Sequence, residues 1–260
     1  MKLRDIFRFS KGTKVVLAIT FSVSLLAIAF AFFYYRSINK SEDPRIRKAR
    51  EFLAEYDKVT GGVDSFNSFH LLDSAYAIFR SLPDYKTSFE TGVINNNKCS
   101  ALLIMAIYDS SITENEKKEL LSLSGKYCDS SIANYTAWIS DWEGLTPSEV
   151  ESNLSEFMTK DDPVFESYDF NKVLKRRVRN ICSAQIETPR RLSVSLTNKG
   201  TIYRHLMKPD SALLFYQEAL SLWDQNITAK NNLSVLLGGE PVRATLIQSL
   251  FPPDKNKKQK

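Results

Sequence analysis

The sequence predicts an all-α protein in which one membrane-spanning helix precedes a domain of antiparallel helical hairpins. Only nine glycines and nine prolines occur in 260 residues. After the first apolar run, no stretch sustains the alternation of apolar and polar residues that is typical of β-strands. Apolar residues instead recur at helical spacing, and repeated hairpins fit this pattern better than one globule does.

The clearest element is an apolar run from Val15 to Tyr35, with the sequence VVLAITFSVSLLAIAFAFFYY. At about 1.5 Å per helical residue the run spans roughly 31 Å, which is close to the ~30 Å hydrocarbon core of a bilayer. We therefore predict a short basic segment over 1–14, a transmembrane helix over 15–35 and a polar linker over 36–44.

A cleaved signal peptide is the alternative interpretation of this run. Ala29-Phe30-Ala31 offers the small residues that a signal peptidase needs. The aromatic residues Phe32–Tyr35 continue the run past that point and suit a membrane interface, which favours a retained anchor. A short basic N-terminus usually stays cytoplasmic. Both interpretations place the C-terminal domain on the extracytoplasmic side, and a bacterial envelope is the setting that we favour.

The positive charge of the chain belongs to the anchor. The net charge is +5, and because the first 40 residues hold seven Lys and Arg but one acid, the remainder carries −1. The basic isoelectric point therefore does not indicate a nucleic-acid surface. The densest basic patch of the domain lacks interleaved aromatic residues, and we interpret it as a solvated helix face or as a contact with lipid or an acidic partner. It comprises Lys172, Lys175, Arg176, Arg177 and Arg179.

Helical segments are predicted in succession over 45–251. A first pair, Ile46–Tyr56 and Phe66–Leu82, ends at Pro83, and a long helix over Ser88–Asp109 follows. Four further helices, which lack the spacing of a repeat, are expected over 114–127, 130–142, 147–160 and 163–186. The tail 252–260 is too polar and basic to pack, and we expect it to be disordered.

A repeat pattern is clearest over 195–237. Its small and large apolar residues fall on two helix faces, with a turn at Lys208-Pro209-Asp210 between them: Leu196, Gly200, Tyr203, Ala212, Tyr216 and Ala219. At this spacing the segment resembles the tetratricopeptide repeat (TPR) family, although Asp224 stands where the family often has proline. The resemblance implies an α-solenoid of antiparallel helix pairs, in which a small residue lets two helices approach. The first predicted helices show a weaker match to this repeat pattern, and residues 110–190 show no match.

The three cysteines, Cys99, Cys128 and Cys182, lack the spacing of metal ligands. In an oxidising compartment Cys99 and Cys128 are placed to bridge adjacent helices. All three are otherwise interpreted as small buried hydrophobic residues. The sequence leaves both alternatives open.

Nothing in the sequence indicates a reaction centre. His70 and His205 are the two histidines, and both lie in apolar helical patterns typical of structural residues. Gly61-Gly62 and Gly238-Gly239 read as turns or helix ends, since neither pair belongs to a phosphate-binding loop pattern. We therefore predict a protein that is not an enzyme and that uses no metal or cofactor.

Stacked helical hairpins build a groove that binds peptides of other proteins. We predict a membrane-anchored scaffold whose groove binds a protein partner, so that tethering raises the local concentration of partner and groove. The groove residues are expected on the helix face that is not used for packing: Asn95, Asn96, Lys98, Asn198, Lys199, Thr201, Ile202 and Arg204.

Two other functions stay open. In the first, the irregular region 110–190 forms the polar pocket of a sensor or enzyme, with Asp141, Trp142, Glu143 and Tyr168 as the first candidates. In the second, the domain is a structural module that associates with itself. A discrete cavity would favour the former, and dimerisation without any other protein would favour the latter.

Overall fold

The structure is a computed structural model that describes residues 10–60 and 68–242. Within these residues it consists of helices and their connections and contains no β-strand, which confirms the predicted all-α class. The predicted tail over 252–260 and the Gly61-Gly62 pair lie outside the described residues.

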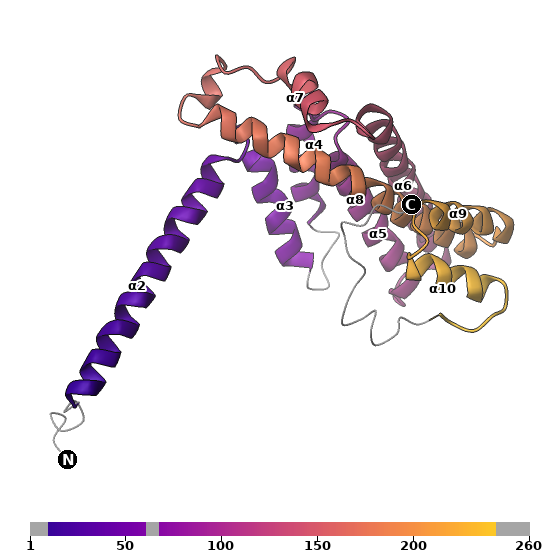
Figure 1. Cartoon of the computed structure of the whole chain (residues 1–260). Helices are drawn as coiled ribbons and strands as arrows, with labels where there is room; N and C mark the ends of the chain where they lie inside the picture. The colour runs from indigo at the N-terminus through magenta and orange to yellow at the C-terminus, as the bar shows by residue number, and fades with distance from the viewer. Residues whose placement is uncertain (1–9, 61–67, 243–260) are drawn as a thin grey trace.

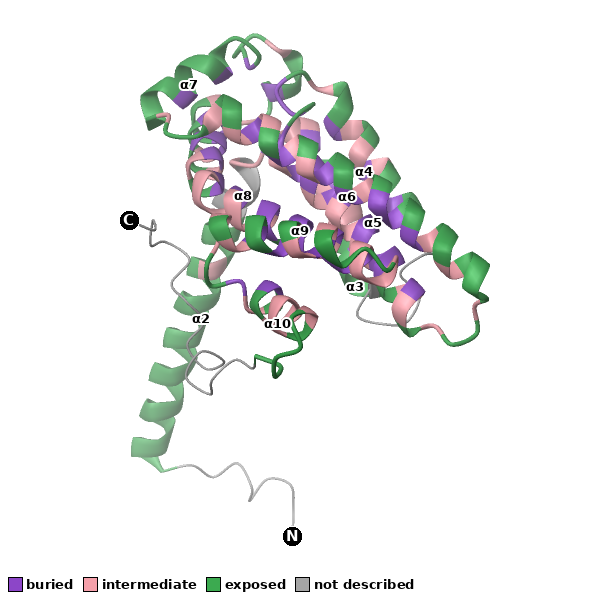
Figure 2. Cartoon of the chain, turned by 90° about the vertical axis from the view of Figure 1, so that its right-hand side faces the viewer, coloured by how far each residue is buried: buried purple, intermediate pink, exposed green. Residues whose placement is uncertain are grey.

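Helix α2 (Lys11–Lys40) stands apart from the other helices (Figure 1). Its apolar side chains are exposed along the predicted span except at Ala31, which is half-buried, as the green colour in Figure 2 shows; Phe30, for example, is 74% exposed. The segment Lys11–Tyr35 is long and apolar enough to cross a membrane. The helix continues five residues beyond Tyr35, so the first part of the predicted linker is helical.

The first helical pair consists of α3 (Arg47–Thr60) and α4 (Phe69–Ser81), which follow a 3-10 turn, η1 (Pro44–Ile46). The pair buries one hydrophobic cluster that includes Ile46, Leu72 and Phe79. Both helices lie where the apolar periodicity predicts them, and the predicted start of the second at Phe66 lies outside the described residues.

Helices α5 (Phe89–Tyr108) and α6 (Glu114–Trp142) form the next and most extensive pair. A capping box between Thr113 and Glu116 starts α6. The prediction of two helices over 114–127 and 130–142 is wrong, because α6 runs through both. No proline or glycine lies between the two predicted segments, so helix propagation continues without a break.

Two predicted boundaries in the middle region are also wrong. Helix α7 (Pro147–Ser155) is shorter than predicted, and Pro163 starts only a 3-10 turn, η2 (Pro163–Phe165). Helix α8 (Phe170–His205) begins after the cap residue Asp169 and runs for 36 residues with Pro189 in its interior. An interior proline lowers the stability of a helix by about 3 kcal/mol. Because α8 packs against α6, α7 and α9, this packing stabilises it as one continuous helix.

The predicted repeat segment forms the C-terminal half of α8, α9 (Pro209–Leu222) and α10 (Ile227–Leu236). The turn at Pro209 lies where it is predicted, and Asn226 caps α10 by accepting a hydrogen bond from the Ala229 amide at 3.1 Å. A Cβ atom at Gly200 would lie 2.6 Å from the Tyr216 ring. The helices therefore approach through this glycine, as the repeat pattern predicts.

The helices pack mainly against their neighbours in the chain. Contacts run from α3 to α4, α5, α6, α8, α9 and α10 in succession, while α7 lies against α8. In addition, α5 contacts α8, and α8 contacts α10. The buried side chains accordingly form several clusters along the succession rather than one centre, as the purple segments in Figure 2 show.

Two glycine-to-alanine changes should shift stability in opposite directions. Gly200→Ala should lower the free energy of unfolding by about 2 kcal/mol, because the new methyl group overlaps the Tyr216 ring. Gly125→Ala should raise it by up to about 1 kcal/mol, because its Cβ meets only Lys199 Nζ at 3.6 Å and alanine favours a helix interior. Thermal denaturation of the full chain in detergent checks both changes. Equal effects would contradict the close approach at Gly200.

Candidate functional site

Most side chains predicted to line an open groove are buried between helices. The buried members of the set are Asn95, Lys98, Lys199, Thr201 and Ile202. Ile202 belongs to a hydrophobic cluster, and Thr201 accepts a hydrogen bond from the Tyr216 hydroxyl at 3.2 Å. The predicted exposure of these residues is wrong because α5 and α8 are each covered by several other helices.

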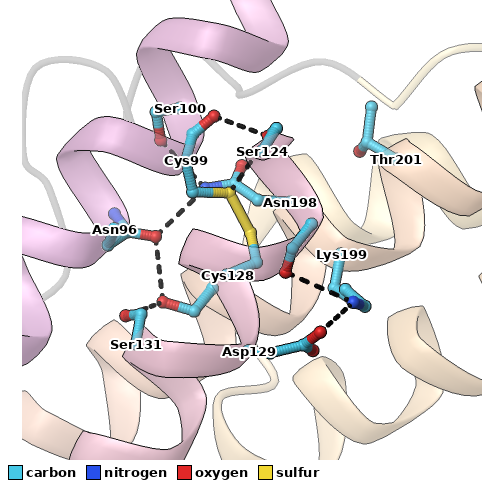
Figure 3. Close-up of a disulfide and its surroundings, with 12 residues drawn as sticks. Asn96, Cys99, Ser100, Ser124, Cys128, Asp129, Ser131, Asn198, Lys199 and Thr201 are labelled. Carbon is cyan, nitrogen blue, oxygen red and sulfur yellow. Dashed lines mark hydrogen bonds and ion pairs between the residues drawn. A yellow bond between two sulfur atoms is a disulfide. The ribbon is translucent and has the colours of Figure 1, made fainter. Parts of the chain in front are cut away.

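The two lysines of this set hold helices together. Lys98 forms an ion pair with Asp73 of α4, and its ammonium lies 5.0 Å from the centroid of the Tyr127 ring. Lys199 Nζ of α8 lies 2.7 Å from Asp129 Oδ2 of α6 (Figure 3). Both ammonium groups therefore have acidic partners within the domain, and neither points into an open groove.

A chain of amide and hydroxyl groups crosses from α5 to α8 (Figure 3). Asn198 Nδ2 donates hydrogen bonds to Asn96 Oδ1 at 3.1 Å and to Ser100 Oγ at 2.9 Å. Ser195 Oγ also donates to Asn96 Oδ1, at 2.9 Å. Asn96 and Asn198 are half-buried, so the structure brings these two predicted residues together mainly as a bridge between helices.

The exposed surface beside this bridge contains two residues that the groove prediction missed. Ile104 and Tyr108 of α5 are 58% and 78% exposed. They follow Ser100 at intervals of four residues, which places all three on one helix face. Arg204, the remaining predicted residue, is half-buried near the end of α8.

A disulfide joins Cys99 of α5 to Cys128 of α6 (Figure 3). Both cysteines are fully buried, and Ser124 Oγ donates a hydrogen bond to the Cys99 carbonyl at 2.8 Å. Of the two alternatives that the sequence left open, the bridge is therefore the one that the structure has. Cys182 is a half-buried free thiol.

A buried ion pair connects the start of α5 to α8. Arg177 Nη1 lies 2.9 Å from Glu90 Oε1, and the two residues are 3% and 8% exposed. The guanidinium carbon also lies 3.9 Å from the centroid of the Tyr85 ring. Burial by itself would lower the pKa of Arg177, but the combined attraction of Glu90, Tyr85 and Asp84 outweighs burial and the pKa is raised. Arg177 thus belongs to the core, unlike the solvated face predicted for the basic patch.

A second buried group fixes the linker after α2 to the domain. Arg45 donates hydrogen bonds to both carboxylate oxygens of Asp84 at 3.2 and 2.8 Å, and also to Asp43. The Tyr85 hydroxyl donates to Asp43 Oδ2 at 3.1 Å. Burial raises the pKa of Asp84, an effect that Arg45 partly offsets. The chain that leaves α2 is therefore held against the loop between α4 and α5.

An open cavity of about 480 Å³ lies in the middle region, where α7 and α8 meet the linker after α2. Its lining combines cationic, acidic and apolar side chains: Ser41, Pro147, Glu151, Lys172, Lys175, Val178 and Arg179. The basic patch of the sequence thus splits, with Lys172, Lys175 and Arg179 facing the cavity and Arg177 in the core. The basic patch is the one feature of the sequence that indicates this site. The sequence does not show that α7 and Ser41 lie beside the patch.

The residues first suspected of forming a pocket do not line this cavity. Trp142 and Tyr168 pack against the hydrophobic cluster around α7 and α8, while Asp141 and Glu143 are exposed. Among residues 10–60 and 68–242, no group of three or more His, Cys, Asp or Glu side chains is arranged to hold a metal ion.

Comparisons of the chain with protein families, curated proteins and solved structures give no match.

Proposed function

We propose that the chain is a single-pass membrane protein whose C-terminal domain lies on the extracytoplasmic side, in a bacterial envelope. Helix α2 supports the anchorage, since its exposed apolar surface needs an apolar environment. The disulfide between Cys99 and Cys128 supports the orientation, because structural disulfides persist in oxidising compartments and are rare in the cytosol.

The domain is proposed to be a TPR-like α-solenoid that binds another protein and performs no chemistry. Two features support this: the helices pack in chain succession, and α8 and α9 approach through Gly200. In such a stack, helices of equivalent position lie side by side and present a continuous surface. Anchoring the domain would confine it near its partner and raise their effective concentration.

The observation that carries the scaffold proposal is the exposed pair of Ile104 and Tyr108 beside the bridge between α5 and α8. Aromatic and aliphatic side chains at a surface are the usual anchors of protein interfaces. We place the partner surface there, together with the accessible parts of Asn198 and Arg204. The buried residues among those predicted from the sequence would contribute by positioning these helices.

Proximity crosslinking in native membranes tests this function. The double change Ile104→Glu/Tyr108→Glu should abolish recovery of specific crosslinked proteins, because two carboxylates in an apolar contact are strongly unfavourable. Val59→Glu/Phe157→Glu is the matched control, since both side chains are exposed at 41% and 47% and lie on other elements. The control should keep the wild-type set of partners.

One result would contradict the proposed partner surface, and another would contradict the scaffold function itself. If the same proteins were recovered from both double variants, Ile104 and Tyr108 would not form the partner surface. Recovery of nothing except copies of the chain itself would favour self-association.

A ligand-binding function is the second candidate, and the cavity in the middle region favours it. Its volume of about 480 Å³ lies within the range of small-molecule sites. The charged side chains of its lining are three cations and one carboxylate, which is not the cluster of carboxylates expected for an acid-base enzyme. The charge of the lining instead points to an anionic ligand.

A further inference from the structure

The cavity between α7 and α8 carries two cations without a partner in the described residues. Lys172, Lys175 and Arg179 follow one another at intervals of three and four residues, so they lie on one face of α8. Lys172 Nζ lies 3.3 Å from Asp169. Within residues 10–60 and 68–242, Lys175 and Arg179 form no ion pair, and both are exposed.

The cavity also has an apolar wall and one opposing charge. Pro147 and Val178 supply the apolar side, and Glu151 of α7 is the carboxylate that faces the cations. Since Asp169 neutralises Lys172, the cavity keeps a net positive charge after Glu151 is counted. A ligand with one anionic group and adjoining apolar atoms matches this lining.

The position of the cavity on the chain places it at the membrane surface. Ser41, which lines the cavity, is the first residue after α2. Ser41 lies six positions after Tyr35, the end of the apolar run, and at about 1.5 Å per residue this distance along the helix is ~9 Å. The polar layer of a bilayer extends about 5–8 Å beyond the hydrocarbon core. Ser41 therefore lies at the outer edge of the headgroup layer if α2 spans the membrane.

Contacts on both sides of Ser41 hold this arrangement in place. Arg176 Nη1 donates a hydrogen bond to Ser41 Oγ at 3.1 Å, which ties α8 to the end of α2. Glu42 and Arg50 form an ion pair at 3.2 Å. Together with the contacts of Asp43 and Arg45, they keep the cavity next to the anchor.

We propose that this cavity binds the phosphate of an anionic phospholipid from the membrane that α2 spans. Lys175 and Arg179 bind the phosphate, and Pro147 and Val178 contact the glycerol and adjoining carbon atoms. A lipid is favoured over an acidic peptide because the anchor holds the cavity beside headgroups at very high local concentration. The inference rests on the proposed membrane anchorage and is independent of the protein partner.

Native mass spectrometry of the full chain in detergent tests the proposal. The protein is incubated with equal amounts of phosphatidylglycerol and phosphatidylcholine that carry the same acyl chains. Each cation near an anionic lipid contributes a factor of about five to binding. Lys175→Gln/Arg179→Gln should therefore weaken retention of phosphatidylglycerol about 25-fold. Lys118→Gln/Lys126→Gln, which removes two exposed lysines of α6, is the matched control and should change retention less than twofold.

A gain of binding provides a readout that misfolding cannot mimic. Glu151→Gln removes the opposing carboxylate and should strengthen retention of phosphatidylglycerol about fivefold. Equal retention by the cavity variant and the α6 control would overturn the proposal, because the basic flanks of α2 would then account for all binding. Displacement of the lipid by millimolar inorganic phosphate would overturn the lipid assignment in favour of a free phosphate ligand.

The anchorage is measured separately, by carbonate extraction of native membranes that contain the chain. Release of the wild-type chain by carbonate would contradict both the anchorage and the lipid site. Retention of the chain, combined with unchanged lipid binding by Lys175→Gln/Arg179→Gln, would contradict the lipid site alone.

Discussion

Replacing Arg177 by methionine should lower the free energy of unfolding by about 3–5 kcal/mol. The change leaves Glu90 as a buried carboxylate without its ion-pair partner, since Arg177 Nη1 lies 2.9 Å from it. It also removes the cation above the Tyr85 ring. For a domain of this size, a loss of 3–5 kcal/mol lowers the melting temperature by about 10–15 °C. Thermal denaturation of the full chain in detergent measures the shift.

Two further variants separate the buried charge from general damage to α8. Arg179→Met lies two residues away on the exposed side of the same helix and should change the melting temperature by less than about 2 °C. Combining Arg177→Met with Glu90→Gln should recover part of the loss, because no uncompensated charge then stays buried. If Arg177→Met alone were as stable as the wild type, the buried ion pair would not contribute to stability, and water would have to reach Glu90.

The elements that the sequence predicts well are those with local signals. Helix α2 follows from an uninterrupted apolar run, and the turn at Pro209 follows from a proline that suits the start of a helix. The approach of α8 to α9 at Gly200 follows from the spacing of small and large residues. Each of these features is set by residues within one continuous stretch of the sequence and needs no distant segment.

The errors arise where packing between distant segments decides the outcome. Helix α8 continues through Pro189, a residue that normally ends or bends a helix, because α6 and α9 cover it. Lys98 and Lys199 look like surface residues, yet each meets a carboxylate from a different helix. The periodicity of one helix does not show how many other helices surround it, so the exposure of the groove residues was predicted wrongly.

The candidate sites depend even more on distant contacts. Arg177 and Glu90 are 87 residues apart, and the bond between Arg176 and Ser41 spans 135 residues. The basic patch on α8 is visible in the sequence. Its division into a buried ion pair and a cavity lining is set by which segments pack against each side of the helix.

Removing the disulfide by Cys99→Ala/Cys128→Ala should lower the free energy of unfolding by about 3–4 kcal/mol. The bond closes a loop with a sequence separation of 29 residues, and the chain-entropy estimate for such a loop is about 3.6 kcal/mol. The melting temperature should fall by about 10 °C. Cys182→Ala is the control and should leave it nearly unchanged, since this thiol is half-buried and unbonded.

The same bond tests the orientation of the chain in the membrane. If the domain faces an oxidising compartment, alkylation of protein denatured directly from cells should modify Cys182 alone before reduction and all three cysteines after it. Three modified thiols before reduction would mean that the bond is absent in the cell. The proposed extracytoplasmic placement would then have no support from the disulfide. The packing of α5 against α6 would be unaffected, because the surrounding hydrophobic cluster also stabilises it.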